Sequence, residues 1–519
     1  MQYLQATNTE SPDNLTPRLL KLVLNINILA VIVNFTLNFL GSPTLKYLYL
    51  IHIAITLIAV IFFNFSQILP IILTLFFIEG QGRIIWGNAG WTKVIFDSLV
   101  FLSVFKIFIS NKKIYNLKGL PKSLLTLISL HFFWYLFEFS NLESVSYFAV
   151  LASSKIYIYP ILFFFGLTQL EFDTSKDKFQ QDLNFFFFLL GLELALTFYQ
   201  FYMKDSFILQ ISPNYQQAMK DATFAGLFYR PFATAFSPGA ISSYFFVTVG
   251  FLFFKKKSIP GNILKLILIF SLTAAIILCQ VRSSLIKIIL IVLLIQIGEL
   301  VFHRFKAKGF SGIILFSIIM IFGGYYITEK SPMKDDASIT YVKDRFSTLG
   351  DVKAVQSSRL SFSDFLQIAS DKIASKPLGL GPGLTGSVGR LSLEQVKESH
   401  FLNIDMLWAN DNLIISLLID FGIGAIFYLS ILMYIFLYFF QYLTIFYLKK
   451  AQAEFKILLV CFSSVIAILI GSWGTVGLTY NPESFIFWFF AALGFSTIGK
   501  FKNIALNQPK LHIVTEETV

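Results

Sequence analysis

Long apolar runs are the feature that most limits what this chain can fold into. They recur from residue 19 to residue 499 and are about 17 to 24 residues long, the length that a helix needs to cross the ~30 Å hydrocarbon core of a membrane. Only 14% of the residues are charged, whereas soluble domains average about a quarter. The sequence therefore predicts an all-α, polytopic integral membrane protein.

The apolar runs predict about fourteen membrane spans. We expect residues 1–18 to be a cytoplasmic tail and the first apolar run to be a retained helix. Successive spans then cross the membrane in alternating directions, which puts every basic cluster and the tail 500–519 in the cytoplasm, as the positive-inside rule requires. The net charge of +11 therefore marks a membrane surface and does not indicate a nucleic-acid partner. The predicted spans are 19–40, 45–63, 67–79, 94–110, 123–140, 145–168, 183–203, 238–254, 262–281, 284–302, 309–327, 412–446, 454–471 and 483–499. The basic clusters are Lys112, Lys113, Lys118 and Lys122; Lys255, Lys256 and Lys257; Arg304, Lys306 and Lys308; Lys449 and Lys450; and Lys500 and Lys502.

The spans fall into two groups, 19–327 and 412–499, and two connections are much longer than the others. The outer loop 204–237 lies within the first group, and the large periplasmic loop 328–411 separates the two groups. The large loop mixes apolar and charged residues, so we expect it to fold in part as a helix starting at Arg359 and ending before Pro377. In the first group, the range 67–79 is short and contains Pro70, so a re-entrant segment is the alternative there.

A glycine-rich turn, PLGLGPGLTGSVG, follows Pro377. Gly381, Gly383 and Gly386 match the spacing of a dinucleotide-binding motif, but the motif follows a predicted helix and not a strand. A tight turn with positive φ angles is the better interpretation. No CxxC pair or His/Cys cluster is present, so the sequence predicts neither a metal site nor a bound cofactor.

Basic residues at the outer ends of predicted spans are the candidate binding residues. Arg230 lies in LFYRPFATAFSPG, Arg282 lies at a short outward turn, and Arg359 opens the predicted loop helix. An arginine fork suits a phosphate or diphosphate, because it donates parallel hydrogen bonds and keeps its charge. Contact with lipid headgroups or a structural ion pair is the alternative for each residue. Further candidates are Arg83, Lys155 and Arg345.

Four acid–base candidates precede the predicted span 412–446: Glu398, His400, Asp405 and Asp411. Asp411 and His400 are the favoured two, and Asp411 lies where the loop re-enters the membrane. Sugar transfer needs a base that takes the proton of the attacking hydroxyl group. The alternatives are a surface position for His400 and a helix N-cap for Asp411.

Four segments together resemble the O-antigen polymerase and ligase family of bacterial membrane glycosyltransferases. They are YRPFATAFSPG, VRSSLI, RLSFSDFLQIASDKIASKPLGLGPG and NDNLIISLLIDFGIGAIFYL, and they cover roughly residues 225–440. The ligase branch typically has His-Asn where this chain has Asp411-Asn412. This difference favours the polymerase branch, while the ligase branch stays open.

The resemblance implies a GT-C-like enzyme of the bacterial inner membrane that uses a polyprenyl-diphosphate-linked glycan without a metal or nucleotide. Arg230 and Arg282 would hold the diphosphate, Arg359 would position the loop or a second phosphate, and Asp411 or His400 would act on the acceptor. A flippase and a chain-length regulator of the same pathway are the implied partners. A transporter or flippase of lipid-linked glycans is the main rival, and a structural scaffold is a third hypothesis.

Overall fold

A computed structural model describes the chain in the ranges 12–86, 90–110, 120–141, 147–168, 177–203, 230–235, 237–254, 259–279, 281–302, 370–371, 375–384, 412–472, 477–479 and 482–507. All secondary structure in these ranges is helical, and no strand occurs among them. Within these ranges, nine helices are long and apolar enough to cross a membrane. The prediction of an all-α polytopic membrane protein is therefore confirmed.

The helices follow the predicted spans closely. Each predicted range overlaps a helix except 309–327, which lies outside the described residues. The helices are α1 (Pro12–Phe39), α2 (Leu45–Phe62), α3 (Phe65–Ile85), α4 (Gly90–Ser110), α5 (Lys122–Phe137), α6 (Tyr147–Tyr157), α7 (Tyr159–Thr168), α8 (Asp177–Met203), α11 (Pro238–Leu252), α12 (Ile259–Cys279), α13 (Arg282–Phe302), α20 (Leu413–Phe421), α21 (Ala425–Leu448), α22 (Gln452–Gly471) and α23 (Glu483–Asn507), with short 3₁₀ turns at Glu138–Ser140, Gly422–Gly424 and Gly477–Thr479.

The helix α3 is unbroken although it contains Pro70. It runs for 21 residues, and Pro70, which has no backbone N–H to donate, lies in its second turn. The Gln67 side chain accepts a hydrogen bond from the Asn64 backbone N–H at 3.1 Å and so satisfies a donor at the start of the helix. The structure therefore shows one continuous helix in the range for which a re-entrant segment was the alternative.

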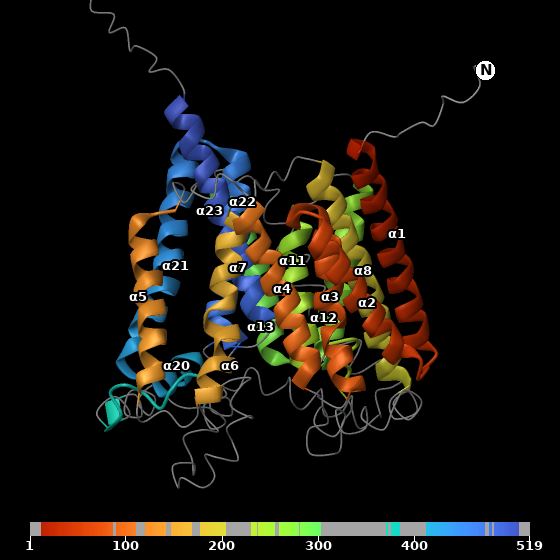
Figure 1. The fold of residues 1–519 in the computed structure, drawn as a ribbon. Coiled ribbons are helices and arrows are strands. Elements are labelled where there is room, and N and C mark those ends of the chain that lie inside the picture. The colour runs from red at the N-terminus through yellow and green to blue at the C-terminus, as the bar shows by residue number, and fades with distance from the viewer. Residues whose placement is uncertain are drawn as a thin grey trace, which may run out of the picture.

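Helix α23 lies at the centre of the packing. It contacts α7 and α22 along its length, and α22 in turn packs against α13 and α21. On one side α5 pairs with α21, and on the other α1 to α4 pack together with α8 beside α1 and α3 (Figure 1). The core between these helices is rich in phenylalanine, including the fully buried Phe164 and Phe490.

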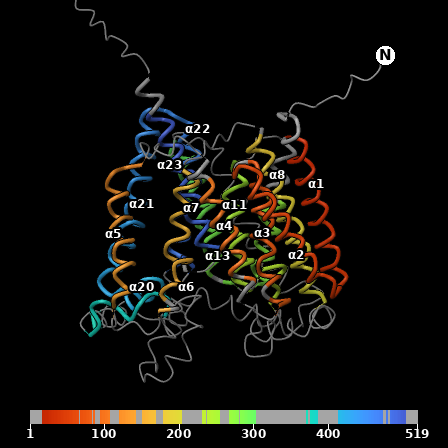
Figure 2. The backbone as a smooth tube through the Cα atoms, viewed as in Figure 1, coloured from red at the N-terminus to blue at the C-terminus, as the bar shows by residue number. Residues whose placement is uncertain are grey.

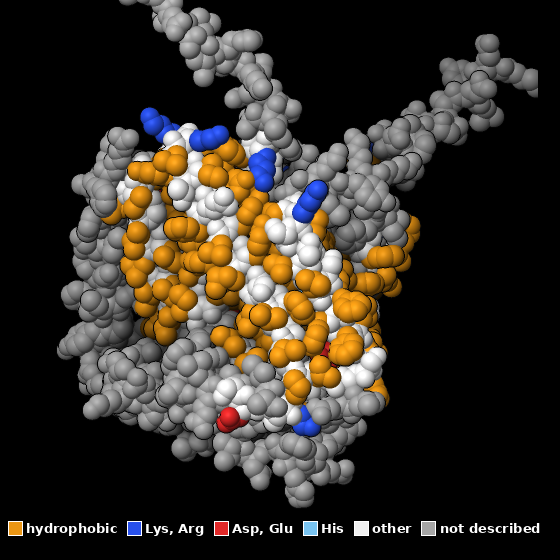
Figure 3. Space-filling view, turned by 90° about the vertical axis from the view of Figure 1, so that its left-hand side faces the viewer, with side chains coloured by type: hydrophobic (Ala, Val, Ile, Leu, Met, Phe, Trp, Pro, Cys, Tyr) orange, Lys and Arg blue, Asp and Glu red, His pale blue; other side chains and the backbone are white. Residues whose placement is uncertain are grey.

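The two ends of the bundle differ. At the terminal end, at the top of Figure 1, α1 begins and α23 ends; at the opposite end, the site end, α11, α13 and α23 begin. Figure 3 shows an apolar band around one face of the molecule, with Lys and Arg side chains gathered along the edge at the terminal end. An apolar belt of this kind suits a surface that faces lipid.

Candidate functional site

Arg230 lies beside the turn that joins α12 to α13, at the site end of the bundle. Its Nε donates a hydrogen bond to the carbonyl of Cys279, the last residue of α12, at 2.9 Å, and the side chain is half-buried. The Cys279 thiol donates in turn to the carbonyl of Pro231 at 3.3 Å. Helix α13 begins with Arg282 directly after this turn. The fold therefore brings Arg230 close to the backbone of Arg282.

The chain after Arg230 leaves the predicted outer loop and enters the bundle without forming a helix. The side chains of Phe232 and Thr234 are at most 1% exposed, and Ala233 has a positive φ of 49°. Non-helical backbone at this depth needs protein partners, because lipid offers no hydrogen bonds. The Gln200 side chain of α8 supplies them: its Oε1 accepts from the N–H groups of Phe232 (3.1 Å) and Ala233 (2.7 Å), and its Nε2 donates to the carbonyl of Ala233 at 3.0 Å.

Glu193, two turns before Gln200 on α8, binds the deepest part of this segment. Its Oε2 accepts the backbone N–H of Thr234 at 3.1 Å, and its Oε1 lies in hydrogen-bond contact with the Thr234 hydroxyl. Glu193 lies roughly ten residues before Met203, the end of α8, which corresponds to about 15 Å along the helix axis. The segment 230–235 is therefore held deep in the bundle by two polar side chains of one helix face.

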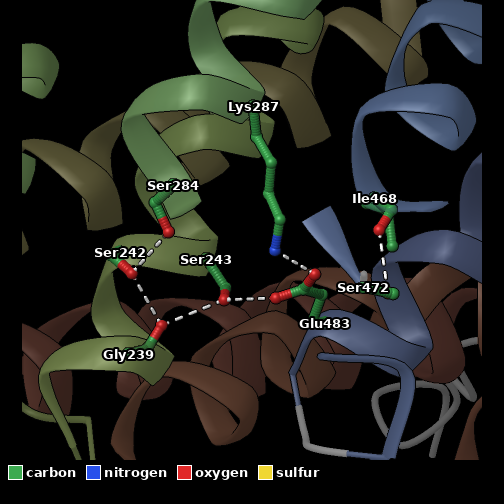
Figure 4. Close-up of polar contacts among 8 residues, drawn as sticks. All are labelled: Gly239, Ser242, Ser243, Ser284, Lys287, Ile468, Ser472 and Glu483. Carbon is green, nitrogen blue, oxygen red and sulfur yellow. Dashed lines mark hydrogen bonds and ion pairs between the residues drawn. The ribbon is translucent and has the colours of Figure 1, made fainter. Parts of the chain in front are cut away.

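The starts of α11, α13 and α23 meet next to this segment, joined by the polar contacts that Figure 4 shows. The Ser242 and Ser284 hydroxyls lie 2.8 Å apart and link α11 to α13, and Ser242 also donates to the carbonyl of Gly239 at 2.8 Å. The Ser243 hydroxyl lies 3.2 Å from Oε2 of Glu483, the first residue of α23. Since the N-terminus of a helix carries a partial positive charge, this meeting point favours an anion.

A buried ion pair joins α13 to α23 at the same place. The Lys287 ammonium contacts Oε1 of Glu483, and the two side chains are 1% and 7% exposed (Figure 4). Two glycines leave the room for it: a Cβ at Gly471 would lie 2.0 Å from Lys287 Cε, and one at Gly477 would lie 2.3 Å from Glu483 Oε1. Each side chain neutralises the charge of the other, because either charge left unpaired in this interior would strongly destabilise the protein.

The glycine-rich turn docks on the bend between α20 and α21 (Figure 2). Gly379, Gly381 and Gly383 have φ angles of 81°, 94° and 98°, so the predicted positive φ angles are confirmed at Gly381 and Gly383; Gly386 lies outside the described residues. Asp420 of α20 accepts the Gly383 N–H at 3.1 Å and the hydroxyl of Tyr157 at 2.8 Å. The turn thus has a structural role here: it ties the end of the large loop to the helices.

Close backbone contact fixes the turn against the bend. The carbonyl of Pro377 accepts from the Ile423 N–H at 2.9 Å, and a Cβ at Gly422, whose φ is 54°, would lie 2.1 Å from this carbonyl oxygen. Of the predicted loop helix that ends before Pro377, Ser370, Asp371, Ser375 and Lys376 are described: the first three are helical and Lys376 is not.

The backbone is described for some of the remaining predicted site residues, and the others lie outside the described residues. Arg83 lies in α3 and Arg282 opens α13, with side chains outside the description, and Lys155 is half-buried in the last turn of α6. Arg345, Arg359, His400 and Asp411 lie outside the described residues. The cap of α20 is formed by Asn412, whose Oδ1 accepts from the N–H of Ile414 at 2.9 Å, so the neighbour of Asp411 fills the N-cap role considered for Asp411.

The sequence analysis missed the residues that organise the site from inside the helices. These are Glu193, Gln200, Lys287, Asp420 and Glu483, all of which lie in or beside apolar runs. The signal was present, because an ionisable or amide side chain within such a run is costly unless it has a partner in the protein. The partners themselves lie far away in sequence.

An apolar cavity of about 120 Å³ lies between α3, α7, α8, α11 and α23. Phenylalanines dominate its lining, among them Phe76, Phe186, Phe251 and Phe485. Pro482, the residue before Glu483, also lines it, so the cavity begins next to the ion pair. An apolar chain could occupy it with a polar head at the starts of α11, α13 and α23.

Within the described ranges, no three His, Cys, Asp or Glu side chains come together as a metal site would require. Both cysteines, Cys279 and Cys461, are free and buried. A scan against protein-family models finds no family that matches this chain, and a search of curated proteins finds no relative. The site therefore has to be interpreted from its own geometry, as part of an all-α polytopic membrane protein.

Proposed function

We propose that this chain is a membrane glycosyltransferase that transfers a glycan from polyprenyl diphosphate to a second lipid-linked glycan, as an O-antigen or exopolysaccharide polymerase does. The observation that carries the proposal is the position of Arg230, hydrogen-bonded at the α12–α13 turn at the end where α11, α13 and α23 begin. A guanidinium group and several helix N-termini in one place suit a diphosphate, which needs several donors and positive charge.

In the proposed reaction the acceptor hydroxyl oxygen attacks the anomeric carbon of the donor glycan. A new C–O bond forms, the bond between the anomeric carbon and the phosphate oxygen breaks, and polyprenyl diphosphate leaves. Arg230 and Arg282 stabilise the charge that develops on the departing diphosphate. Asp411 or His400 takes the hydroxyl proton, and Arg359 positions the loop or a second phosphate. No step requires a metal or a nucleotide.

The proposed arrangement of the chain in the membrane follows from its resemblance to the O-antigen polymerase and ligase family. It has about fourteen spans in a GT-C-like fold, both termini in the bacterial cytoplasm and the site end facing the periplasm. The gathering of Lys and Arg at the terminal end supports this orientation. The apolar cavity beside Pro482 supports a substrate with a hydrocarbon chain. A flippase and a chain-length regulator are the proposed protein partners, and a ligase that transfers the glycan to lipid A core or protein is the nearest alternative.

A transporter of lipid-linked glycans is a second candidate function, favoured by one observation. Residues 230–235 form a non-helical segment inside the bundle, and interrupted backbone of this kind lines the substrate sites of many transporters. A transporter moves the lipid-linked glycan without changing it, whereas a polymerase lengthens it, so the length of the glycan separates the two.

Deletion of the gene in its host tests the proposal. We expect the surface glycan, separated on a gel, to change from a ladder of long chains to a single repeat unit on its normal acceptor. Long lipid-linked chains that accumulate without reaching the acceptor would indicate the ligase. Loss of all surface glycan, with unextended repeat units held in the cytoplasmic leaflet, would indicate the transporter and contradict the polymerase.

A further inference from the structure

The hydroxyl of Thr234 lies between two oxygen atoms in the interior of the bundle. Its Oγ1 is 2.7 Å from the carbonyl oxygen of Phe77 on α3, and it is in hydrogen-bond contact with Glu193 Oε1 on α8. Thr234 and Glu193 are both fully buried. One hydroxyl group thus bridges α3 and α8 through the segment 230–235.

The two contacts of the Thr234 hydroxyl require two protons, and only the hydroxyl's own proton is present when Glu193 is ionised. A threonine hydroxyl has a single hydrogen, and both a carbonyl and a carboxylate can only accept. If Glu193 were ionised, Thr234 could donate to Phe77 or to Glu193, and the other contact would set two oxygen lone pairs against each other. Both contacts are satisfied together when Glu193 carries the second proton: Glu193 donates to Thr234, and Thr234 donates to Phe77.

The surroundings of Glu193 also favour the neutral carboxyl group. In the described part of the chain Glu193 makes no ion pair, and an unpaired buried charge is among the most expensive features a protein can hold. Helix α8 packs against α1, α3, α11 and α12. Among the described side chains of these elements, the titratable neighbours are Tyr244 of α11, Glu79 of α3 and Cys279 at the end of α12. The Tyr244 hydroxyl donates to the carbonyl of Phe76 at 2.7 Å, and Tyr244 interacts electrostatically with Glu79 and Glu193. The buried polar side chains described in α1 are the uncharged Asn27, Asn34 and Asn38.

We propose that Glu193 is a proton-binding site and that its proton locks the segment 230–235 between α3 and α8. Glu193 takes the proton from water and returns it to water. Release of the proton leaves one of the two Thr234 contacts repulsive, so the segment loosens from α3 or α8.

Arg230 would respond to this proton because the segment is held as one unit. Gln200 binds Phe232 and Ala233, Glu193 binds Thr234, and Arg230 and Pro231 are both bound to Cys279. Glu193 therefore acts as a positioning residue for Arg230, and raising the pH loosens the segment. The inference stands apart from the proposed function, since it concerns the proton and the segment and not the reaction.

Infrared spectroscopy of the full-length protein in lipid nanodiscs tests the proton directly. We expect wild type to show the C=O stretching band of a buried, protonated carboxylic acid, and Glu193→Gln to lose this band. Thr234→Val should keep the band but shift it, because the acid loses its hydrogen-bond acceptor. Wild-type and Glu193→Gln spectra that coincide in this region would overturn the proposal. If Glu193→Gln does not accumulate, Thr234→Val decides: an unshifted spectrum would overturn it.

The coupling to Arg230 has its own readout in Cys279, whose thiol donates to Pro231. In a Cys461→Ser background, labelling by a thiol reagent reports on Cys279 alone, since the chain has two cysteines. We expect the labelling rate of the protein with Glu193 to rise several-fold relative to that of Glu193→Gln as the pH is raised. Because both proteins carry the same thiol, the ratio of the two rates cancels the effect of thiol ionisation on labelling. A ratio that stays constant with pH would show that the proton does not control the segment.

Discussion

Arg230→Ala is expected to remove the long glycan ladder when it is expressed in the deletion strain in place of wild type. In the proposed reaction Arg230 stabilises the charge on the departing diphosphate, and loss of one such group lowers a transfer rate by about 10²–10³-fold. Its Nε bond to the Cys279 carbonyl fixes the guanidinium beside the start of α13. Gel analysis of the surface glycan, with immunoblotting for membrane insertion, measures the effect.

Two variants make this result specific. Arg230→Lys keeps the charge but loses the planar fork, so it should restore shorter chains or fewer of them. Arg18→Ala removes an exposed arginine from α1 near the terminal end and should restore the full ladder. A full ladder from Arg230→Ala at wild-type protein levels would rule out the diphosphate role of Arg230.

Lys287→Met is expected to be the most destabilising single change among the ion pairs described. Among the described residues it leaves the buried Glu483 carboxylate with only the Ser243 hydroxyl as partner, and breaking a buried pair in this way costs about 3–5 kcal/mol. The double variant Lys287→Met/Glu483→Gln removes both charges and should recover most of that loss. Thermal unfolding in detergent is followed by the fraction that stays monodisperse on size exclusion. It gives the order of stability of wild type, Lys287→Met and the double variant.

Lys456→Met is the matched control, because Lys456 pairs with Glu299 at 3.4 Å and their side chains are 32% and 27% exposed. A pair of this kind contributes roughly 0–1 kcal/mol, so its loss should barely change the unfolding temperature. Equal effects of Lys287→Met and Lys456→Met would mean that the Lys287–Glu483 pair does not hold α13 and α23 together.

The sequence was sufficient for the parts of the fold that depend on local pattern. Apolar runs of about the length of a membrane span predicted the helices. The Ser237-Pro238 pair marks the start of α11, where the Ser237 hydroxyl caps the helix by accepting from the Ala240 N–H at 3.2 Å. The glycines after Pro377 predicted positive φ angles because only glycine takes them without strain. These features need no knowledge of distant residues.

The interior of the site could not be predicted in the same way. Glu193 meets Thr234, and Lys287 meets Glu483, across 41 and 196 residues of sequence, and nothing local to either residue names its partner. An isolated acid in an apolar run shows that a partner is needed but does not say which one. The loop placement expected for Arg230 was incomplete for the same reason, since Gln200 and Glu193 draw the residues after it into the bundle.

Reconstitution of the purified protein with a polyprenyl-diphosphate-linked repeat unit is the most direct measurement of the central claim. Products are separated by glycan length, and released polyprenyl diphosphate is counted at the same time. The proposed polymerase makes chains of two and more repeats and releases one polyprenyl diphosphate for each bond formed, without added metal or nucleotide. Transport of the unchanged substrate across the bilayer, with no longer glycan and no polyprenyl diphosphate released, would contradict the account.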